Sequence, residues 1–128
     1  RLPTSTASSP YARLLQKRYE WLRQLQNSLS KDLSAPLASH GFRNWKQLSR
    51  KWEKRSRLGP AARQRLDRAL VHPALAQAHQ LEQALVAMWQ QRRQEAHHAF
   101  DEWLAQARSP SWPRVRAWCD ALSPPAAA

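Results

Sequence analysis

The chain has 128 residues, with 21 Lys or Arg against 9 Asp or Glu, and a formal net charge of +12. Its single Cys excludes an internal disulfide and fits a reducing compartment, and no apolar run approaches the roughly 18 residues that a membrane-spanning helix needs. The length suits one domain with a real core, and the charge favours an anionic partner.

The residue types favour helices over strands. Gly occurs only twice and Ile is absent, while Ala, Leu, Gln and Arg are abundant. Because β-branched residues are so few, no segment has the composition of a strand. We therefore predict an all-α protein, a bundle of about five to six amphipathic helices joined by short loops that prolines mark.

The domain limits follow from composition. Residues 1–9 are polar and rich in Ser and Thr, and they predict a disordered lead-in. One helical-bundle domain is predicted over residues 10–122, with a frayed tail over 123–128. The first residue is Arg1 rather than Met, so the sequence is open to being a fragment of a longer protein.

Apolar residues at helical spacing place the helices within this domain. Pro10 opens the first helix, and Pro36 and Gly41 lie in the connection that follows it. A continuous helix over 73–108 would be far longer than usual, so we place a break near residues 92–94. The predicted helices cover residues 10–33, 43–57, 60–71, 73–92, 95–108 and a last stretch that opens between 110 and 113 and ends at 122.

The positive charge is concentrated in residues 42–68. This block has ten Lys or Arg and two acids, which gives +8, whereas residues 1–41 give +4 (six bases, two acids) and residues 69–128 give zero (five of each). On a helix over 43–57, five cations fall within an arc of about 80°. Trp45, Leu48 and Trp52 lie on the opposite face.

We predict that this block binds a polyanion. Five like charges with no acid on their arc repel one another, and an anionic partner makes such an arrangement easier to tolerate. A merely solvated basic helix is the alternative. Charge alone does not choose between nucleic acid and an acidic membrane surface. The predicted polyanion-binding residues are Arg43, Lys46, Arg50, Lys54, Arg57, Arg63, Arg65 and Arg68.

Residue patterns for catalysis or cofactor binding are missing. The sequence has no Ser, His and acid constellation, no Gly-rich phosphate loop and no CxxC pair. His97 and His98 lie near Glu95 and Asp101, but no HExxH spacing is present, and we interpret this cluster as a solvated helix face. We assign no catalytic, cofactor-binding or metal residue, and expect the chain not to be an enzyme by itself.

Seven Trp invite two interpretations, because an exposed Trp among Arg residues suits base stacking or a membrane interface. Trp45, Trp52, Trp103 and Trp118 lie on inward stripes and are predicted to pack in the core. The remaining three are better candidates for a contact surface: Trp21, Trp89 and Trp112.

Three further residues receive a structural interpretation. Cys119 lies on the inward stripe of the last helix, so we expect a buried and inert thiol. His72 and His79, seven residues apart, are interpreted as a helix cap and a surface residue.

Two runs carry a resemblance to known proteins, RSRLGPAARQRLDRALVHPALAQAHQLEQALVAMWQQR and AFDEWLAQARSPSWPRVRAWCDAL. They resemble an α-helical tail that occurs at the C-terminus of certain bacterial membrane fatty-acid desaturases and of an insertion-sequence transposase family with an acidic-triad nuclease core. The shared elements are a basic helix (Arg63, Arg65, Leu66), then Pro73 and Leu75, a long Leu-rich helix, a helix with a central Trp103 and a short last helix.

Details of the resemblance point both ways. The run ARLLQKRYEWLRQL and the pair Met88-Trp89, with Arg92 after it, look like the desaturase version. Leu104 stands where desaturases commonly have Cys, and WLAQARSPSWP is at least as close to the transposase version. The histidine boxes of the desaturases and the carboxylate triad of the transposases are both missing, so no catalytic or metal residue is carried over.

The resemblance implies two alternative functions, and a third stands beside them. Our first hypothesis is a non-catalytic accessory tail of a desaturase-like enzyme, located in the cytoplasm at the inner face of the membrane. There residues 43–68 would meet anionic lipid or an acidic partner protein. The second is a DNA- or RNA-binding tail of a transposase-like protein. The third is a scaffold that binds only protein.

Overall fold

The computed structural model describes residues 10–90 and 93–122 of the chain, and within them it is entirely helical. The prediction of an all-α bundle is therefore confirmed. The lead-in and the tail predicted at the two ends lie outside the described residues. The helices are α2 (Pro10–Asp32), α3 (Ser34–Ser39), α4 (Trp45–Glu53), α5 (Pro60–Ala69), α6 (Pro73–Met88), α7 (Arg93–Arg108) and α8 (Pro113–Leu122), with a 3₁₀ turn, η1, at Arg55–Arg57.

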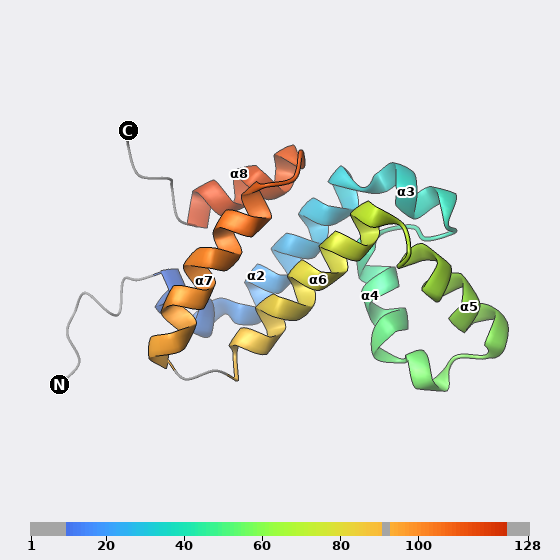
Figure 1. Cartoon of the computed structure of the whole chain (residues 1–128), viewed down its shortest axis with the longest axis horizontal. Helices are drawn as coiled ribbons and strands as arrows, with labels where there is room; N and C mark the ends of the chain where they lie inside the picture. Colours follow the sequence, from blue (N-terminus) through green and yellow to red (C-terminus); the bar gives the residue numbers. More distant parts are fainter. Residues whose placement is uncertain (1–9, 91–92, 123–128) are drawn as a thin grey trace.

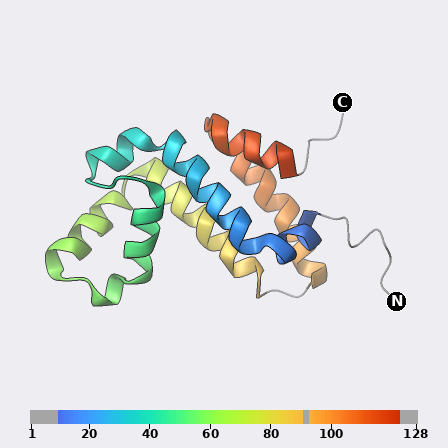
Figure 2. The same ribbon diagram turned by 180° about the vertical axis from the view of Figure 1, so that it is seen from behind.

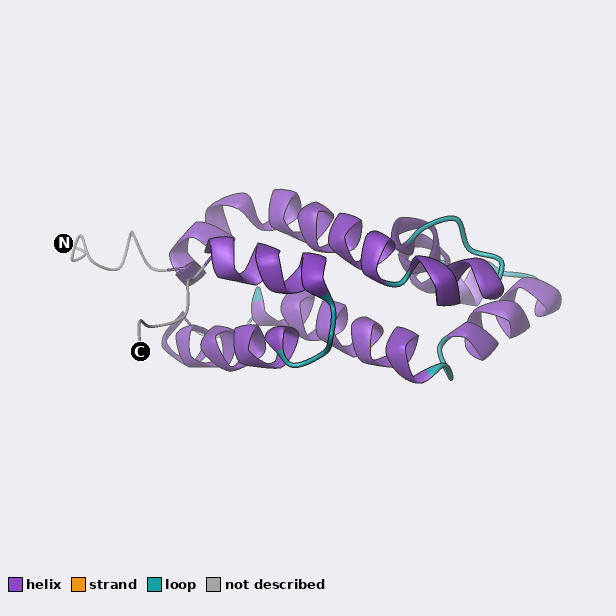
Figure 3. Cartoon of the chain, turned by 90° about the horizontal axis from the view of Figure 1, so that it is seen from above, coloured by secondary structure: helices purple, strands orange, loops and turns teal. Residues whose placement is uncertain are grey.

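The long helix α2 organises the packing. It runs beside α6 through the middle of the molecule, α7 lies along α6, and α8 packs against both α2 and α7 (Figure 1). The short helices α3, α4 and α5 gather at the end of the molecule opposite α7, and α4 packs on α2 there (Figure 2). Seen from above, the molecule is elongated, with loops only at the helix ends (Figure 3). The basic block thus occupies one end of the bundle.

The connection predicted after the first helix is wrong, because residues 34–39 form the short helix α3. Pro36 lies in its first turn, where a backbone N–H has no helical partner and a proline is tolerated. Leu37 on this helix is fully buried. Gly41 follows with a positive φ of 82°, a conformation that glycine adopts without strain.

The helix predicted over 43–57 is shorter in the structure. Asn44 stops it on the N-terminal side, because its backbone is extended and its side-chain Oδ1 accepts a hydrogen bond from the Gln47 N–H at 2.9 Å. Lys54 ends it on the other side. In η1, Arg55 donates two hydrogen bonds to Asp67 of α5, a contact between helices that a helical wheel does not contain.

The residues of the long apolar pattern after residue 73 form two helices, as predicted. Their boundaries lie earlier than expected, since α6 ends at Met88 and α7 begins at Arg93. The pair packs as an antiparallel hairpin, and the Trp103 Nε1–H of α7 donates to the Leu81 carbonyl of α6 at 2.8 Å.

The Trp predictions are partly confirmed. Trp45, Trp103 and Trp118 are buried as expected, and Trp52 packs against the core while partly exposed. The expectation that Trp21 and Trp112 form a contact surface is wrong, because only 6% and 7% of their surfaces are exposed. Helices on several sides of α2 widen its buried face beyond one stripe, and this covers Trp21. Trp89 is half-buried, with its ring against exposed Tyr19.

Cys119 lies on the inner face of α8 and is fully buried, as predicted. Burial raises the pKa of its thiol from 9.0 to about 11. Only the thiolate attacks an alkylating reagent, so two units of pKa lower the reactive fraction about a hundredfold.

We therefore expect iodoacetamide to alkylate Cys119 at least about a hundredfold more slowly in the folded protein than in urea at the same pH. Mass spectrometry of quenched samples measures both rates. Equal rates would show that α8 does not cover the thiol in solution.

Candidate functional site

The inner face of α4 is attached to the bundle by a buried carboxylate. Glu82 of α6 is only 2% exposed. Its Oε2 accepts hydrogen bonds from the Trp45 Nε1–H at 3.0 Å and from Gln26 of α2 at 2.9 Å, and its Oε1 accepts from the Ser49 hydroxyl at 2.9 Å. Because a buried charge needs such partners, this network holds α4 in one position against α2 and α6.

A second hydrogen bond fixes the start of α4. The backbone N–H of Trp45 donates to the Ser30 hydroxyl of α2 at 2.8 Å, and that hydroxyl donates to the carbonyl of Gln26. Glu82 is assigned no role from the sequence alone. A signal was present, since it lies between Leu81 and Leu85 on the buried side of α6.

With its inner face attached, α4 directs its cations outward. They line a groove of about 330 Å³, here called the α4 groove. It contains five cations and no carboxylate, and all five cationic residues are exposed. Lys51 is one of them and was absent from the predicted binding set, because it lies beside the narrow arc of the helical wheel. The lining residues are Arg43, Asn44, Lys46, Gln47, Arg50, Lys51, Lys54 and Leu58.

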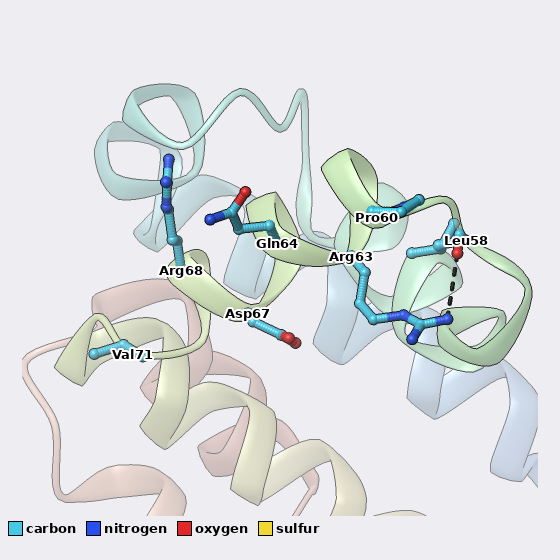
Figure 4. A pocket seen from close by; sticks show the side chains of 7 residues that line it. All are labelled: Leu58, Pro60, Arg63, Gln64, Asp67, Arg68 and Val71. Atoms are coloured by element: carbon cyan, nitrogen blue, oxygen red, sulfur yellow. Dashed lines mark hydrogen bonds between the residues drawn. The ribbon is translucent and has the colours of Figure 1, made fainter.

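The structure separates the other predicted cations from this groove. Arg57 is exposed in η1. Arg63 of α5 is half-buried, and its guanidinium donates to the Leu58 carbonyl at 3.3 Å (Figure 4). It also donates to the Ser56 carbonyl at 3.4 Å. It therefore supports the turn between α4 and α5. Four of the eight predicted residues, Arg43, Lys46, Arg50 and Lys54, lie together in the groove.

Arg65 and Arg68 line a second hollow of about 380 Å³ between α3 and α5, beside His40. Figure 4 shows the Arg68 side chain directed toward α3 and away from Asp67. Asp67 is paired with Arg55, and the hydrogen bonds from Arg55 lower the pKa of the Asp67 carboxyl. The hollow thus adds two exposed cations to this end of the molecule.

The histidines form no metal site among the residues whose side chains the structure describes. His98 is exposed and lies 3.1 Å from Glu102, while the side chain of His97 lies outside the described part. His72 caps α6 as predicted, since its Nδ1 accepts from the Ala74 N–H. Within the described residues, no helix is long and apolar enough to cross a membrane.

His79 is not the surface residue that we predicted. It is half-buried beneath α4, its ring centroid lies 4.5 Å from that of Trp52, and its buried Nδ1 has no hydrogen-bond partner. Burial lowers the pKa of His79 below 6.5, and the negative charge of Glu82 opposes this shift. One titrating group thus lies directly under the helix that forms the groove.

Comparison with known proteins finds one family. The model of the transposase family of the ISL3 type matches residues 12–124, which is most of the chain. No curated protein and no solved structure matches. The match supports the transposase side of the resemblance, and nothing in the comparisons supports the desaturase side.

Replacing Glu82 by Ala should destabilise the fold, because the buried donors of Trp45 and Ser49 lose their acceptor. An unsatisfied buried donor costs roughly 1–3 kcal/mol, so we expect a loss of about 3 kcal/mol or more in the free energy of unfolding. Urea denaturation followed by circular dichroism measures it. Glu102→Ala is the matched control, since Glu102 is exposed and its removal should change stability by less than about 0.5 kcal/mol. Equal effects of the two would contradict the role of Glu82.

His79 should make the fold less stable in acid. The pKa of His79 is lower in the folded protein, so the unfolded chain binds the proton more readily. The contribution of neutral His79 to the free energy of unfolding is therefore complete above pH 6.5, and it is lost as the pH falls toward and through the lowered pKa. The variant His79→Gln should flatten this dependence in urea midpoints measured from about pH 7.5 to 5. His98→Gln, at an exposed position, should leave it unchanged. A slope that survives in His79→Gln would assign the acid sensitivity elsewhere.

Proposed function

The chain belongs to the ISL3 family of transposases, and on that basis we propose that it is a DNA-binding module that takes no catalytic step itself. Transposases act on DNA, and DNA is a polyanion that Lys and Arg bind by neutralising phosphates. The observation that carries the proposal is the α4 groove, with five exposed cations and no carboxylate among its lining residues.

The surroundings of the groove favour nucleic acid over a lipid surface. A helix that lies in a membrane interface combines cations with exposed Trp, Phe or Leu. Here the apolar face of α4 is turned inward, with Trp45 and Leu48 fully buried. The exposed large apolar side chains in the described part of the chain are Tyr19 and Val71, and neither lines the groove.

The acidic side chains support a role outside catalysis. Acid-triad nucleases need three carboxylates in one site, and the described residues bring no three His, Cys, Asp or Glu together. Glu82 is buried and engaged with three donors, and Asp67 is paired with Arg55. These carboxylates stabilise helix contacts.

We expect the double charge reversal of Arg50 and Lys54, Arg50→Glu with Lys54→Glu, to weaken binding of a duplex DNA by at least about tenfold. Both residues lie in the groove, so the change replaces two cations that face phosphates with two anions. Fluorescence anisotropy of a labelled duplex over a salt series measures the dissociation constant, and circular dichroism checks that helicity is retained.

The matched control is Arg23→Glu with Arg114→Glu, which changes the net charge equally at exposed positions outside the groove. It should weaken binding less than about threefold. Equal losses in both variants would show that overall charge, and not the groove, attracts DNA. Binding to anionic vesicles without binding to duplex or single-stranded DNA would refute the proposal in favour of a lipid surface.

A further inference from the structure

We infer that the α4 groove binds the sugar–phosphate backbone of duplex DNA and does not read base edges. The inference rests on the proposed function and concerns the part of the DNA that the groove contacts. Phosphate contacts position a protein on DNA, whereas contacts with base edges supply sequence specificity. The two modes need different side chains, and the structure shows which ones α4 has free.

The amide side chains in the groove are already committed to the protein backbone. The Asn44 Oδ1 accepts from the Gln47 N–H at 2.9 Å, and the Gln47 Oε1 accepts from the Arg43 N–H at 2.8 Å. Asn and Gln read adenine with the carbonyl oxygen and the amide nitrogen together. These bonds hold both amide oxygens against the backbone at the start of α4, so turning either amide toward an adenine would break a cap hydrogen bond.

Three of the five groove cations lie where a recognition helix does not use them. Helices that read the major groove contact bases with their N-terminal residues. In α4 the amide side chains near the N-terminus form the cap, Arg50 and Lys51 lie in the last turn, and Lys54 is the C-cap. Lys is a point charge that suits phosphate, and Lys supplies three of the five cations of the groove.

The length of α4 fits a run of phosphates. Nine residues rise about 13 Å along the helix axis, which equals about four base-pair steps of 3.4 Å along the duplex axis, each step adding one phosphate per strand. Cations are present at both ends of this length, with Arg43 before the first turn and Lys54 at the C-cap. A groove lined in this way can follow the DNA backbone whatever the base sequence.

The first experiment compares two labelled duplexes of equal length, one rich in G·C pairs and one rich in A·T pairs, with the full chain. We expect dissociation constants within about threefold of each other at every salt concentration, because only phosphates are contacted. The slope of log K against log salt should approach about −4.5 if all five cations engage phosphates. A preference of more than about tenfold for either duplex would overturn the inference, while absence of binding to both at low salt would overturn the proposed function as well.

The second experiment separates charge from shape. The variant Arg43→Lys with Arg50→Lys keeps both charges but removes the planar guanidinium that pairs with guanine. We expect affinity within about threefold of the original chain for both duplexes, with an unchanged salt slope. A loss of about tenfold or more that is confined to the G·C-rich duplex would show base reading and overturn the inference.

The comparison variant Arg43→Gln with Arg50→Gln removes the two charges. The salt slope should become shallower by about 1.8, equally for both duplexes, because two phosphate contacts are lost. Neither substitution alters the backbone N–H of residue 43 that bonds Gln47, so the cap of α4 is retained. An unchanged slope would show that these two arginines do not face phosphates, and would overturn the inference.

Discussion

Three donors converge on the carboxylate of Glu82, and the position of α4 depends on them. Two belong to α4 itself, the indole of Trp45 and the hydroxyl of Ser49, and the third is Gln26 of α2. Removing a carboxylate from water is costly, and these hydrogen bonds offset that cost only when all three helices are in place. The network therefore specifies one arrangement of α4, whereas apolar packing alone would tolerate small shifts.

The cationic surface follows from this arrangement. The nine residues of α4 carry three cations, and two more flank the helix. Such a helix gains little stability from its own sequence, because the like charges repel one another. Burial of Trp45 and Leu48 and the bonds to Glu82 hold it against the bundle nonetheless. The same contacts that bury one side of α4 keep its charged side exposed, which joins the stability of the fold to the proposed binding of DNA.

Most of the helices could be predicted from the sequence, because apolar spacing and proline positions are local signals. The stripe of α6 from Leu75 to Met88 is buried as the spacing indicates. The predictions were wrong where contacts between residues distant in sequence determine the local structure. The residues around Pro36 form α3, and Leu37 of this helix is buried in the core. The helix that follows Asn44 ends at Glu53, and the next turn is held by the ion pair between Arg55 and Asp67.

The candidate site shows the same division. The sequence by itself determined the basic block, the all-helical class and the two opposed faces of α4, because each depends only on residue type and spacing. Only the tertiary structure decided which cations lie together. It gathers Arg43, Lys46, Arg50 and Lys54 with Lys51 in one groove, and it directs Arg63 toward backbone carbonyls between α4 and α5. The physical reason is that a guanidinium or a carboxylate takes whichever partner the packed helices bring within reach, and a helical wheel contains a single helix.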